Sequence, residues 1–302
     1  MRLDNNKEFF IQLIKIISEY YKIDSAQVEK DYYVTLLLKE IAKRIPNIIF
    51  KGGTSLSKCH KIIHRFSEDI DLTLQEDFQT QGQKRKFKKE IINACDSLNL
   101  KLLNYEEIRS RRDYNCYKIQ YPINYQSQTF KPLLLVETTY ITSSYPSEIQ
   151  PVTSIIYDYL LDSDNLDLIL EYELEPFNIR VQSLERTFID KVFAICDYAI
   201  SNRIDRNSRH IYDLSRLLIK VNLNDDLKKL VKEVREERKK HNTCYSARNN
   251  ININEILKSI IDSNLYKNDY NKITKNMMYK DLSYEEAVNA LNIIIFSNVF
   301  EN

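Results

Sequence analysis

The chain has 302 residues, of which 43% are hydrophobic and 29% are charged, and this composition excludes a collagen-like or disordered protein. Its net charge of +1 means that any attraction to nucleic acid must come from local clusters of charge. Five cysteines, an odd number without a CxxC pair, argue against a disulfide framework or a zinc site and suit a reducing cytoplasm.

Neither a secretory signal nor a membrane span is predicted. The first 21 residues carry charges throughout, and the longest apolar runs are far shorter than the ~20 residues that a membrane span needs. We therefore expect a soluble, cytoplasmic protein without a membrane partner.

The N-terminal half mixes helical and strand-like patterns. Asp24-Ser25 is a predicted cap for the second helix, and Pro46 is expected to end it. In chain order we expect helices over 6–21 and 26–45, a strand over 47–50, a helix over 54–64, a strand over 70–74, a basic helix over 83–97, strands over 101–106, 114–122 and 131–142, a helix over 154–162, and edge strands over 167–173 and 178–182.

From Ser183 onward the apolar spacing is almost wholly helical. We predict an α+β fold, with a mixed-sheet domain and its N-terminal helices over 1–180 and a helical domain over 181–302 that closes the active-site cleft. The helices expected in the second domain cover 183–201, 206–220, 224–241, 252–264 and 283–297.

Glycine is scarce, with three residues in the chain against roughly 7% in an average protein. Two of the three are adjacent, at Gly52-Gly53, so we expect a positive φ or a close approach of the backbone there. Thr54 and Ser55 follow at the start of an expected helix, where free N–H groups and hydroxyls favour a phosphate. The alternative is a simple turn.

Three acids have the spacing of a metal site. Asp69 and Asp71 are two residues apart on an expected strand, so both carboxylates face the same side and repel unless a cation such as Mg²⁺ lies between them. Glu137 interrupts an apolar strand, and on a strand next to Asp71 it would complete a two-metal site. The alternatives are a solvated acidic edge for the aspartates and an ion pair for Glu137.

In this order, a strand, Gly-Gly-Thr, a helix, Asp-x-Asp and a later acidic strand form the pattern of DNA polymerase β-like nucleotidyltransferases. In detail the chain resembles the AbiEii/AbiGii toxin family. The matching segments are 51–58 (KGGTSLSK), 66–72 (FSEDIDL), Glu29-Lys30-Asp31-Tyr32, 185–191 (ERTFIDK) and 209–214 (RHIYDL).

The resemblance implies an NTP-dependent toxin that uses Mg²⁺, is neutralised by a separately encoded antitoxin and, as in some relatives, adds nucleotides to the 3′ end of tRNA. It also implies residue roles. Asp69 and Asp71 would be metal ligands, Ser67 a phosphate contact, Lys191 a triphosphate ligand and Asp213 a further essential acid. We therefore assign catalysis to Asp69, Asp71, Glu137, Lys191 and Asp213, metal binding to Asp69, Asp71 and Glu137, and nucleotide binding to Gly52, Gly53, Thr54, Ser55, Lys58, Ser67 and Lys191.

Several of these residues also have ordinary structural interpretations. Lys191 could form a surface salt bridge, and Asp213 could pair with Arg209 four residues earlier on one helix. The fifteen residues between Gly53 and Asp69 exceed the spacing in many related enzymes, which leaves the path of residues 60–66 open.

Basic clusters at 84–89, 109–112 and 235–240 could follow a nucleic-acid backbone, although solvated helix faces explain them equally well. The chain's 21 tyrosines offer candidates for base stacking. These features favour RNA, above all tRNA, as the acceptor. Two other functions stay open: nucleotide transfer to a protein or small-molecule hydroxyl, and non-catalytic binding of nucleotide or RNA.

Overall fold

The computed structural model describes residues 1–127 and 130–301, and these form two compact units. The main change of unit falls between Val181 and Gln182, next to the predicted boundary. Two short segments that we had placed in the first domain belong to the second unit. Unit 1 comprises Met1–Lys61, Phe66–Tyr140 and Ser147–Val181, and unit 2 comprises Ile62–Arg65, Ile141–Pro146 and Gln182–Asn302.

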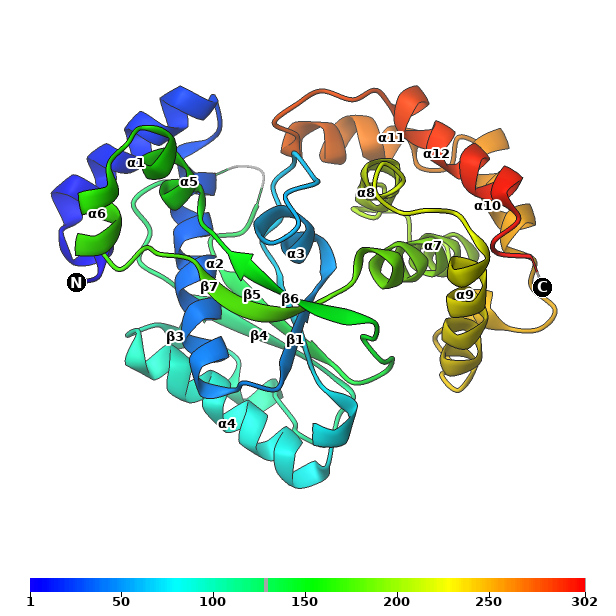
Figure 1. The fold of residues 1–302 in the computed structure, drawn as a ribbon, viewed down its shortest axis with the longest axis horizontal. Coiled ribbons are helices and arrows are strands. Elements are labelled where there is room, and N and C mark those ends of the chain that lie inside the picture. Colours follow the sequence, from blue (N-terminus) through cyan, green and yellow to red (C-terminus); the bar gives the residue numbers. More distant parts are fainter. Residues whose placement is uncertain (128–129, 302) are drawn as a thin grey trace. The chain divides into compact units, whose positions relative to one another are not determined.

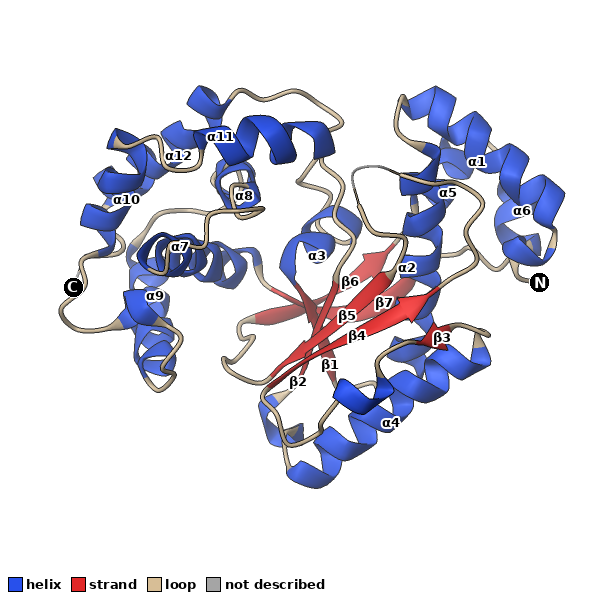
Figure 2. Cartoon of the chain, turned by 180° about the vertical axis from the view of Figure 1, so that it is seen from behind, coloured by secondary structure: helices blue, strands red, loops and turns tan. Residues whose placement is uncertain are grey.

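A mixed seven-stranded sheet in the order β3-β4-β5-β2-β1-β7-β6 forms the framework of unit 1 (Figures 1 and 2). β1 pairs antiparallel with β2, while β2 with β5 and β1 with β7 pair parallel. The prediction of an α+β fold is confirmed. The strands are β1 Ile48–Lys51, β2 Ile70–Leu74, β3 Lys101–Leu102, β4 Tyr114–Gln120, β5 Leu134–Thr139, β6 Ser147–Val152 and β7 Phe177–Gln182.

Helices of unit 1 share one hydrophobic core with the sheet, which includes Phe10, Leu37, Ile91 and Ile156. The Asp24 side chain caps α2, accepting a hydrogen bond from the Ala26 N–H at 2.9 Å, as the sequence predicted. The helices are α1 Lys7–Tyr21, α2 Ser25–Arg44, α3 Gly52–Lys58, α4 Gln81–Ser97, α5 Ile155–Asp162 and α6 Leu166–Glu171.

Unit 2 is helical apart from its connecting segments. Ser183 caps α7, and Ser283 with Glu286 forms a capping box at the start of α12. Across the described part of the chain, we find no helix with both the length and the apolar character of a membrane span. The helices are α7 Leu184–Ile200, α8 Arg209–Leu217, α9 Asp225–Lys239, α10 Ile253–Asp262, α11 Lys267–Asp269 and α12 Tyr284–Ser297.

Several elements differ from the prediction. The strand predicted over 101–106 is reduced to β3, and a 3-10 turn follows at Tyr105–Glu107. The helix predicted over 54–64 ends at Lys58, and residues 60–64 continue as irregular chain into unit 2. The strand predicted over 167–173 is instead α6, because its sequence LDLILE places apolar residues at both helical and alternating spacing.

The sheet edge also differs from the prediction. β7 was expected at an edge but lies inside the sheet, and the edge is β6, which the sequence reading missed. β6 contains Pro151, which lacks the N–H that an interior strand needs and is therefore suited to an edge.

Leu72 on β2 is fully buried, so we expect Leu72→Ala to lower the free energy of unfolding by about 2–5 kcal/mol through lost contacts and a residual cavity. Urea titration of the purified variant measures this. Leu170→Ala removes the same atoms from a side chain that is 63% exposed and should change stability by less than ~0.5 kcal/mol. Equal effects of the two changes would contradict the assigned core.

Candidate active site

One row of side chains crosses four strands of the sheet. Asp71 on β2 lies opposite Lys51 on β1 and opposite Glu137 on β5, and Glu137 lies opposite Cys116 on β4. Strands lie about 4.8 Å apart, so neighbours in such a row are in reach of one another. The two acids therefore occupy adjacent positions on parallel strands, as predicted for Glu137.

The alternation along β2 and β5 directs these acids away from the core. On β2, Ile70 and Leu72 are fully buried, whereas Asp71 between them is only partly buried. On β5, Val136 is fully buried, whereas the next residue, Glu137, is only partly buried. Asp69 immediately precedes β2, and its charge acts on Cys116, which lies opposite Glu137. Asp71 and Glu137 thus belong to one face of the sheet, and Asp69 lies where the chain enters β2.

Gly52 makes the closest approach to this row. Its φ is +76°, in the left-handed region that favours glycine, and a Cβ placed on it would lie 1.9 Å from Asp71 Oδ2. Both reasons that the sequence offered for a glycine therefore apply at this position. The turn that begins α3 is in direct contact with the candidate metal strand.

The hydroxyl residues after the glycines connect this turn to the segment before β2. Thr54 Oγ1 donates to Ser67 Oγ at 3.0 Å, which joins two of the predicted nucleotide-binding residues. Ser55 Oγ donates to the Gly52 carbonyl at 2.9 Å and closes the turn.

The side chain of Lys58 is directed toward α2. Its buried ammonium donates to Asp31 Oδ1 at 2.5 Å and to Thr35 Oγ1 at 2.7 Å, both on α2. These contacts give Lys58 a structural role, because an ammonium saturated by the scaffold has little capacity left for a phosphate. We revise its assignment accordingly.

A divalent cation fits the chemistry of the acidic row. Mg²⁺ prefers carboxylate oxygens and commonly takes one or two protein carboxylates, completing its shell with water and substrate phosphates. Within residues 1–127 and 130–301, no group of three or more His, Cys, Asp or Glu side chains is close enough to hold a metal by itself. A metal at Asp71 and Glu137 would therefore draw its remaining ligands from substrate and solvent.

Two residues of β4 border the acids and were not predicted. Tyr114 donates a hydrogen bond to Glu137, and burial together with the Glu137 charge raises its pKa. Tyr114 is 46% exposed. Burial, assisted by Glu137 and Asp69, raises the pKa of Cys116 to about 11. Alternation along β4 indicated which face these residues occupy, but only the pairing with β5 identifies them as neighbours of Glu137.

The other predicted residues form a buried ionic cluster in unit 2. Asp213 on α8 accepts two hydrogen bonds from the Arg65 guanidinium, both at 2.7 Å, and one from Lys191 Nζ at 2.6 Å. Asp213 is fully buried, and Arg65 is 2% exposed. Arg65 lies four residues before Asp69 and was not predicted, since its partner is distant in sequence.

The charges of this cluster define what each group can do. Burial alone would raise the pKa of Asp213, but Arg65 and Lys191 outweigh it and hold that pKa far below its usual range. Asp213 therefore remains a carboxylate and cannot serve as a proton donor. We revise it from a catalytic acid to a positioning residue that holds Lys191.

Lys191 shares its carboxylate partner, Asp213, with Arg65. Burial lowers its pKa, Asp213 opposes this effect, and the charge of Arg65 adds to it. Because Asp213 is shared with Arg65, the Lys191 ammonium is incompletely neutralised and an additional anion would stabilise it.

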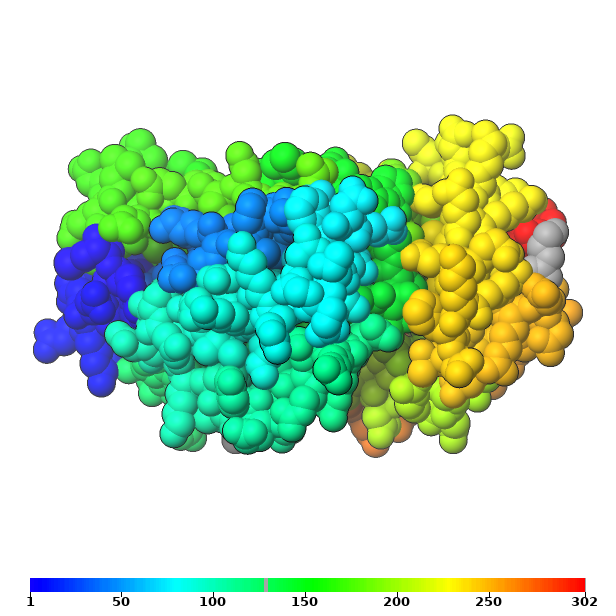
Figure 3. Space-filling model, turned by 90° about the horizontal axis from the view of Figure 1, so that it is seen from below, coloured from blue at the N-terminus to red at the C-terminus, as the bar shows by residue number. Residues whose placement is uncertain are grey.

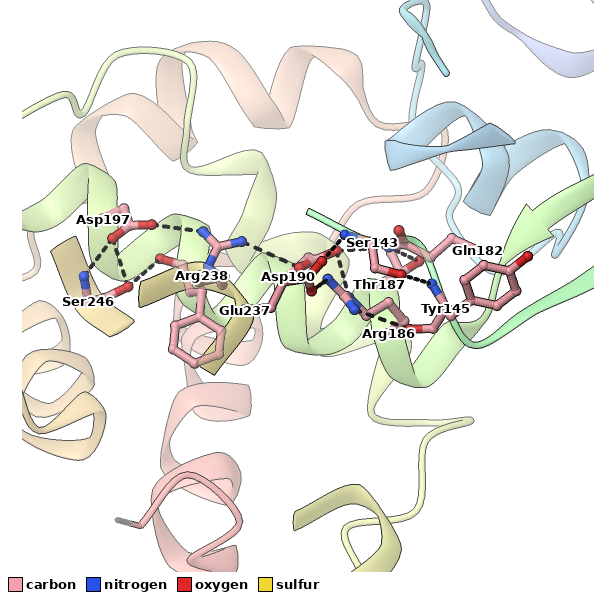
Figure 4. A network of polar contacts seen from close by, with 11 residues as sticks. Ser143, Tyr145, Gln182, Arg186, Thr187, Asp190, Asp197, Glu237, Arg238 and Ser246 are labelled. Carbon is pink, nitrogen blue, oxygen red and sulfur yellow. Dashed lines mark hydrogen bonds and ion pairs between the residues drawn. The ribbon is translucent and has the colours of Figure 1, made fainter. Parts of the chain in front are cut away.

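A second polar network in unit 2 fixes α7, the helix that carries Lys191 (Figure 4). Arg186 donates to Glu237 on α9 at 2.8 Å and to the Tyr145 carbonyl at 3.1 Å. Arg238 on α9 donates to Asp197 on α7 at 2.8 Å. These bonds tie α7 to α9 and to the segment Ile141–Pro146, which directly follows β5 and Tyr140.

The basic cluster over 84–89 lies on α4, which forms part of the surface of unit 1 in Figure 3. Lys84 lies 4.2 Å from the centre of the Tyr140 ring and also pairs with Asp113. Arg85, Lys86 and Lys89 are exposed. This surface offers cations to a polyanion, and it equally fits a solvated helix face.

The chain matches the model of one protein family and is similar to solved structures. A family model described as "Nucleotidyl transferase AbiEii toxin, Type IV TA system" matches residues 36–290, well over half of the chain. No curated protein matches.

Among solved structures, the chain is similar to MenT4, the nucleotidyltransferase toxin Rv2826c from Mycobacterium tuberculosis H37Rv, at 13% identity and a TM-score of 0.48, over 93% of this chain and 98% of that one. It is also similar to JHP933 from Helicobacter pylori, at 17% identity and a TM-score of 0.44, over 89% of this chain and 91% of that one.

Gly52→Ala should lower the free energy of unfolding by at least about 1–3 kcal/mol, because alanine is strained at this φ and its Cβ would displace Asp71. Gly82→Ala is the matched control. A Cβ there has no neighbour within 4 Å, and the helical position should make the change stabilising by about 0.4–1 kcal/mol. Chemical denaturation gives both values, and a neutral Gly52→Ala would contradict the close approach.

Proposed function

Because this chain belongs to the AbiEii family of nucleotidyltransferase toxins of type IV toxin–antitoxin systems, we propose that it transfers a nucleoside monophosphate from a Mg²⁺-bound NTP to the 3′ end of tRNA in the cytoplasm. The family match confirms the resemblance and the enzyme class that the motifs predicted. The observation that carries the proposal is the adjacency of Asp71 and Glu137, with Gly52 in contact with Asp71.

Asp71 and Glu137 would hold the metal, with Asp69 two residues before Asp71 and with substrate and solvent completing the ligand shell. When bound, Mg²⁺ supplies charge for the triphosphate and acidifies the attacking hydroxyl of the acceptor. The carboxylates orient it, and Tyr114, through its hydrogen bond to Glu137, limits the rotation of that side chain.

The phosphates would be bound by the turn over 52–55 and by Ser67. The contact between Thr54 and Ser67 supports this assignment, since it joins the turn to the segment that leads into Asp69. Lys191 would neutralise charge as it develops on the leaving pyrophosphate. Asp213 keeps the Lys191 ammonium in place for that task.

The charge of the α4 surface bears on the choice of acceptor. The exposed cations of α4 favour a polyanion, and an RNA 3′ end presents the hydroxyl that the reaction requires. As a member of a toxin–antitoxin family, the protein has NTP as substrate and a cognate antitoxin as partner.

Incubation with total tRNA, Mg²⁺ and each labelled NTP in turn should transfer label to tRNA, and Asp71→Asn should reduce the rate at least about 100-fold by weakening metal binding. Leu170→Ala serves as the surface control. If the label appears on protein or on a small molecule, that molecule is the acceptor and tRNA is not. Binding of nucleotide without any Asp71-dependent transfer would favour the non-catalytic alternative, and activity that survives EDTA would contradict the metal.

We expect nucleotide transfer to depend on pH through the buried ammonium of Lys191. Burial lowers its pKa, so the ammonium loses its proton at a lower pH than a free lysine, and triphosphate recognition should decline as the solution becomes alkaline. The value of kcat/KM for NTP, which reports groups of the free enzyme, should therefore fall on the alkaline side. Lys191→Arg keeps its charge and should remove this decline. The same alkaline profile in both proteins would exclude Lys191 as its source.

A further inference from the structure

Three consecutive charged residues of α2 are buried in unit 1. Glu29, Lys30 and Asp31 are 0%, 1% and 8% exposed, and they belong to the sequence motif that had no assigned role. Consecutive helical residues point about 100° apart, so each of them reaches a different neighbouring segment. Charges in a protein interior are costly unless they are paired, and the partners therefore indicate what the motif does.

Lys30 reaches the segment that carries the first metal-binding acid. Its ammonium pairs with the Glu68 carboxylate and donates to the Lys131 carbonyl at 2.9 Å. The same ammonium lies 4.8 Å from the centre of the Phe130 ring, which packs on Phe66 at 4.8 Å between ring centres. Lys30 thus contacts the residue directly before Asp69.

Asp31 reaches the helix that follows the glycine turn. Its carboxylate accepts a hydrogen bond from the ammonium of Lys58, at the end of α3. It also accepts one, at 2.8 Å, from the N–H of Ile155 at the start of α5. α3 is seven residues long, so an anchor at its last residue also restricts the turn that begins it.

Glu29 holds the connection between β4 and β5. Its carboxylate accepts the N–H groups of Asn124 and Tyr125 at 3.0 and 3.1 Å, and the Asn124 amide at 2.7 Å. Three neighbouring positions of one helix therefore contact the segment that leads into Asp69, the helix that follows Gly52 and residues 124–125 between β4 and β5, the strand of Glu137.

We propose that Lys30 is a positioning residue for the metal site, acting through Glu68 on Asp69, while Glu29 and Asp31 fix the surrounding segments. This inference rests on the proposed function. Lys30 itself touches neither metal nor substrate. It determines the direction from which the Asp69 carboxylate approaches the row formed by Asp71 and Glu137.

The test separates positioning from stability. Lys30→Met removes the Lys30 ammonium from Glu68, and we expect the Mg²⁺ concentration for half-maximal transfer to rise at least about tenfold, as for other residues that orient metal ligands. The double variant Lys30→Met/Glu68→Leu replaces the ion pair by apolar groups, which should restore the melting temperature. Its Mg²⁺ requirement should stay at least about tenfold raised.

Lys39→Met is the matched control, since it makes the same change on the same helix. Its ammonium donates to the Glu173 and Glu175 carbonyls at 2.8 and 3.3 Å, neither of which belongs to the acidic row. The Mg²⁺ requirement of this variant should be that of the wild type. An equal rise in Lys39→Met, or a wild-type Mg²⁺ requirement in the double variant, would overturn the proposal.

Hydrogen exchange provides a readout that does not depend on turnover. Amides over 66–71 should exchange faster in Lys30→Met than in the wild type and in Lys39→Met. Unchanged exchange would overturn the positioning role even if the Mg²⁺ requirement rose. If the wild-type protein transfers no nucleotide, the proposed function fails, and the exchange measurement still decides the role of Lys30.

Discussion

The parallel pairing of β2 with β5 brings the carboxylates of Asp71 and Glu137 to neighbouring positions, where like charges repel each other. Much of unit 1 maintains this arrangement. The alternate residues Ile70, Leu72 and Val136 are buried, so slipping either strand by one residue would turn its acid into the core. Gly52 lets the neighbouring turn approach without a side chain in between. The sheet therefore holds two carboxylates side by side, with Lys51 opposite Asp71 and Tyr114 hydrogen-bonded to Glu137.

Long elements with a clear period were predictable from the sequence, and α1, α2, α4 and α7 lie within a few residues of their expected bounds. Short elements were not. The six residues of α6 fit two periods, and β6 is a strand only because β7 offers it a partner. In both cases tertiary contacts override a weak local preference.

The residues of the candidate site were likewise only partly predictable from the sequence. Order along the chain predicted that Glu137 lies beside Asp71, because both belong to strands with one acid among apolar residues. Charge alone could not separate Lys58, which the scaffold binds, from Lys191, whose carboxylate partner is shared. Arg65 was not predicted, because its role depends on the ion pair with Asp213. Pairs so distant along the chain leave no periodic signal in a single sequence.

That distance has a consequence for biosynthesis. Ile62–Arg65 leaves the ribosome early, whereas its partner on α8 is made 148 residues later. Chains grow from the N-terminus, so Arg65 lacks its carboxylate partner until α8 has been made. A nascent or truncated chain that stops before Asp213 lacks the clamp on the segment entering the metal strand. The buried ion pair of Arg65 can therefore form only after α8 of the second unit has been synthesised.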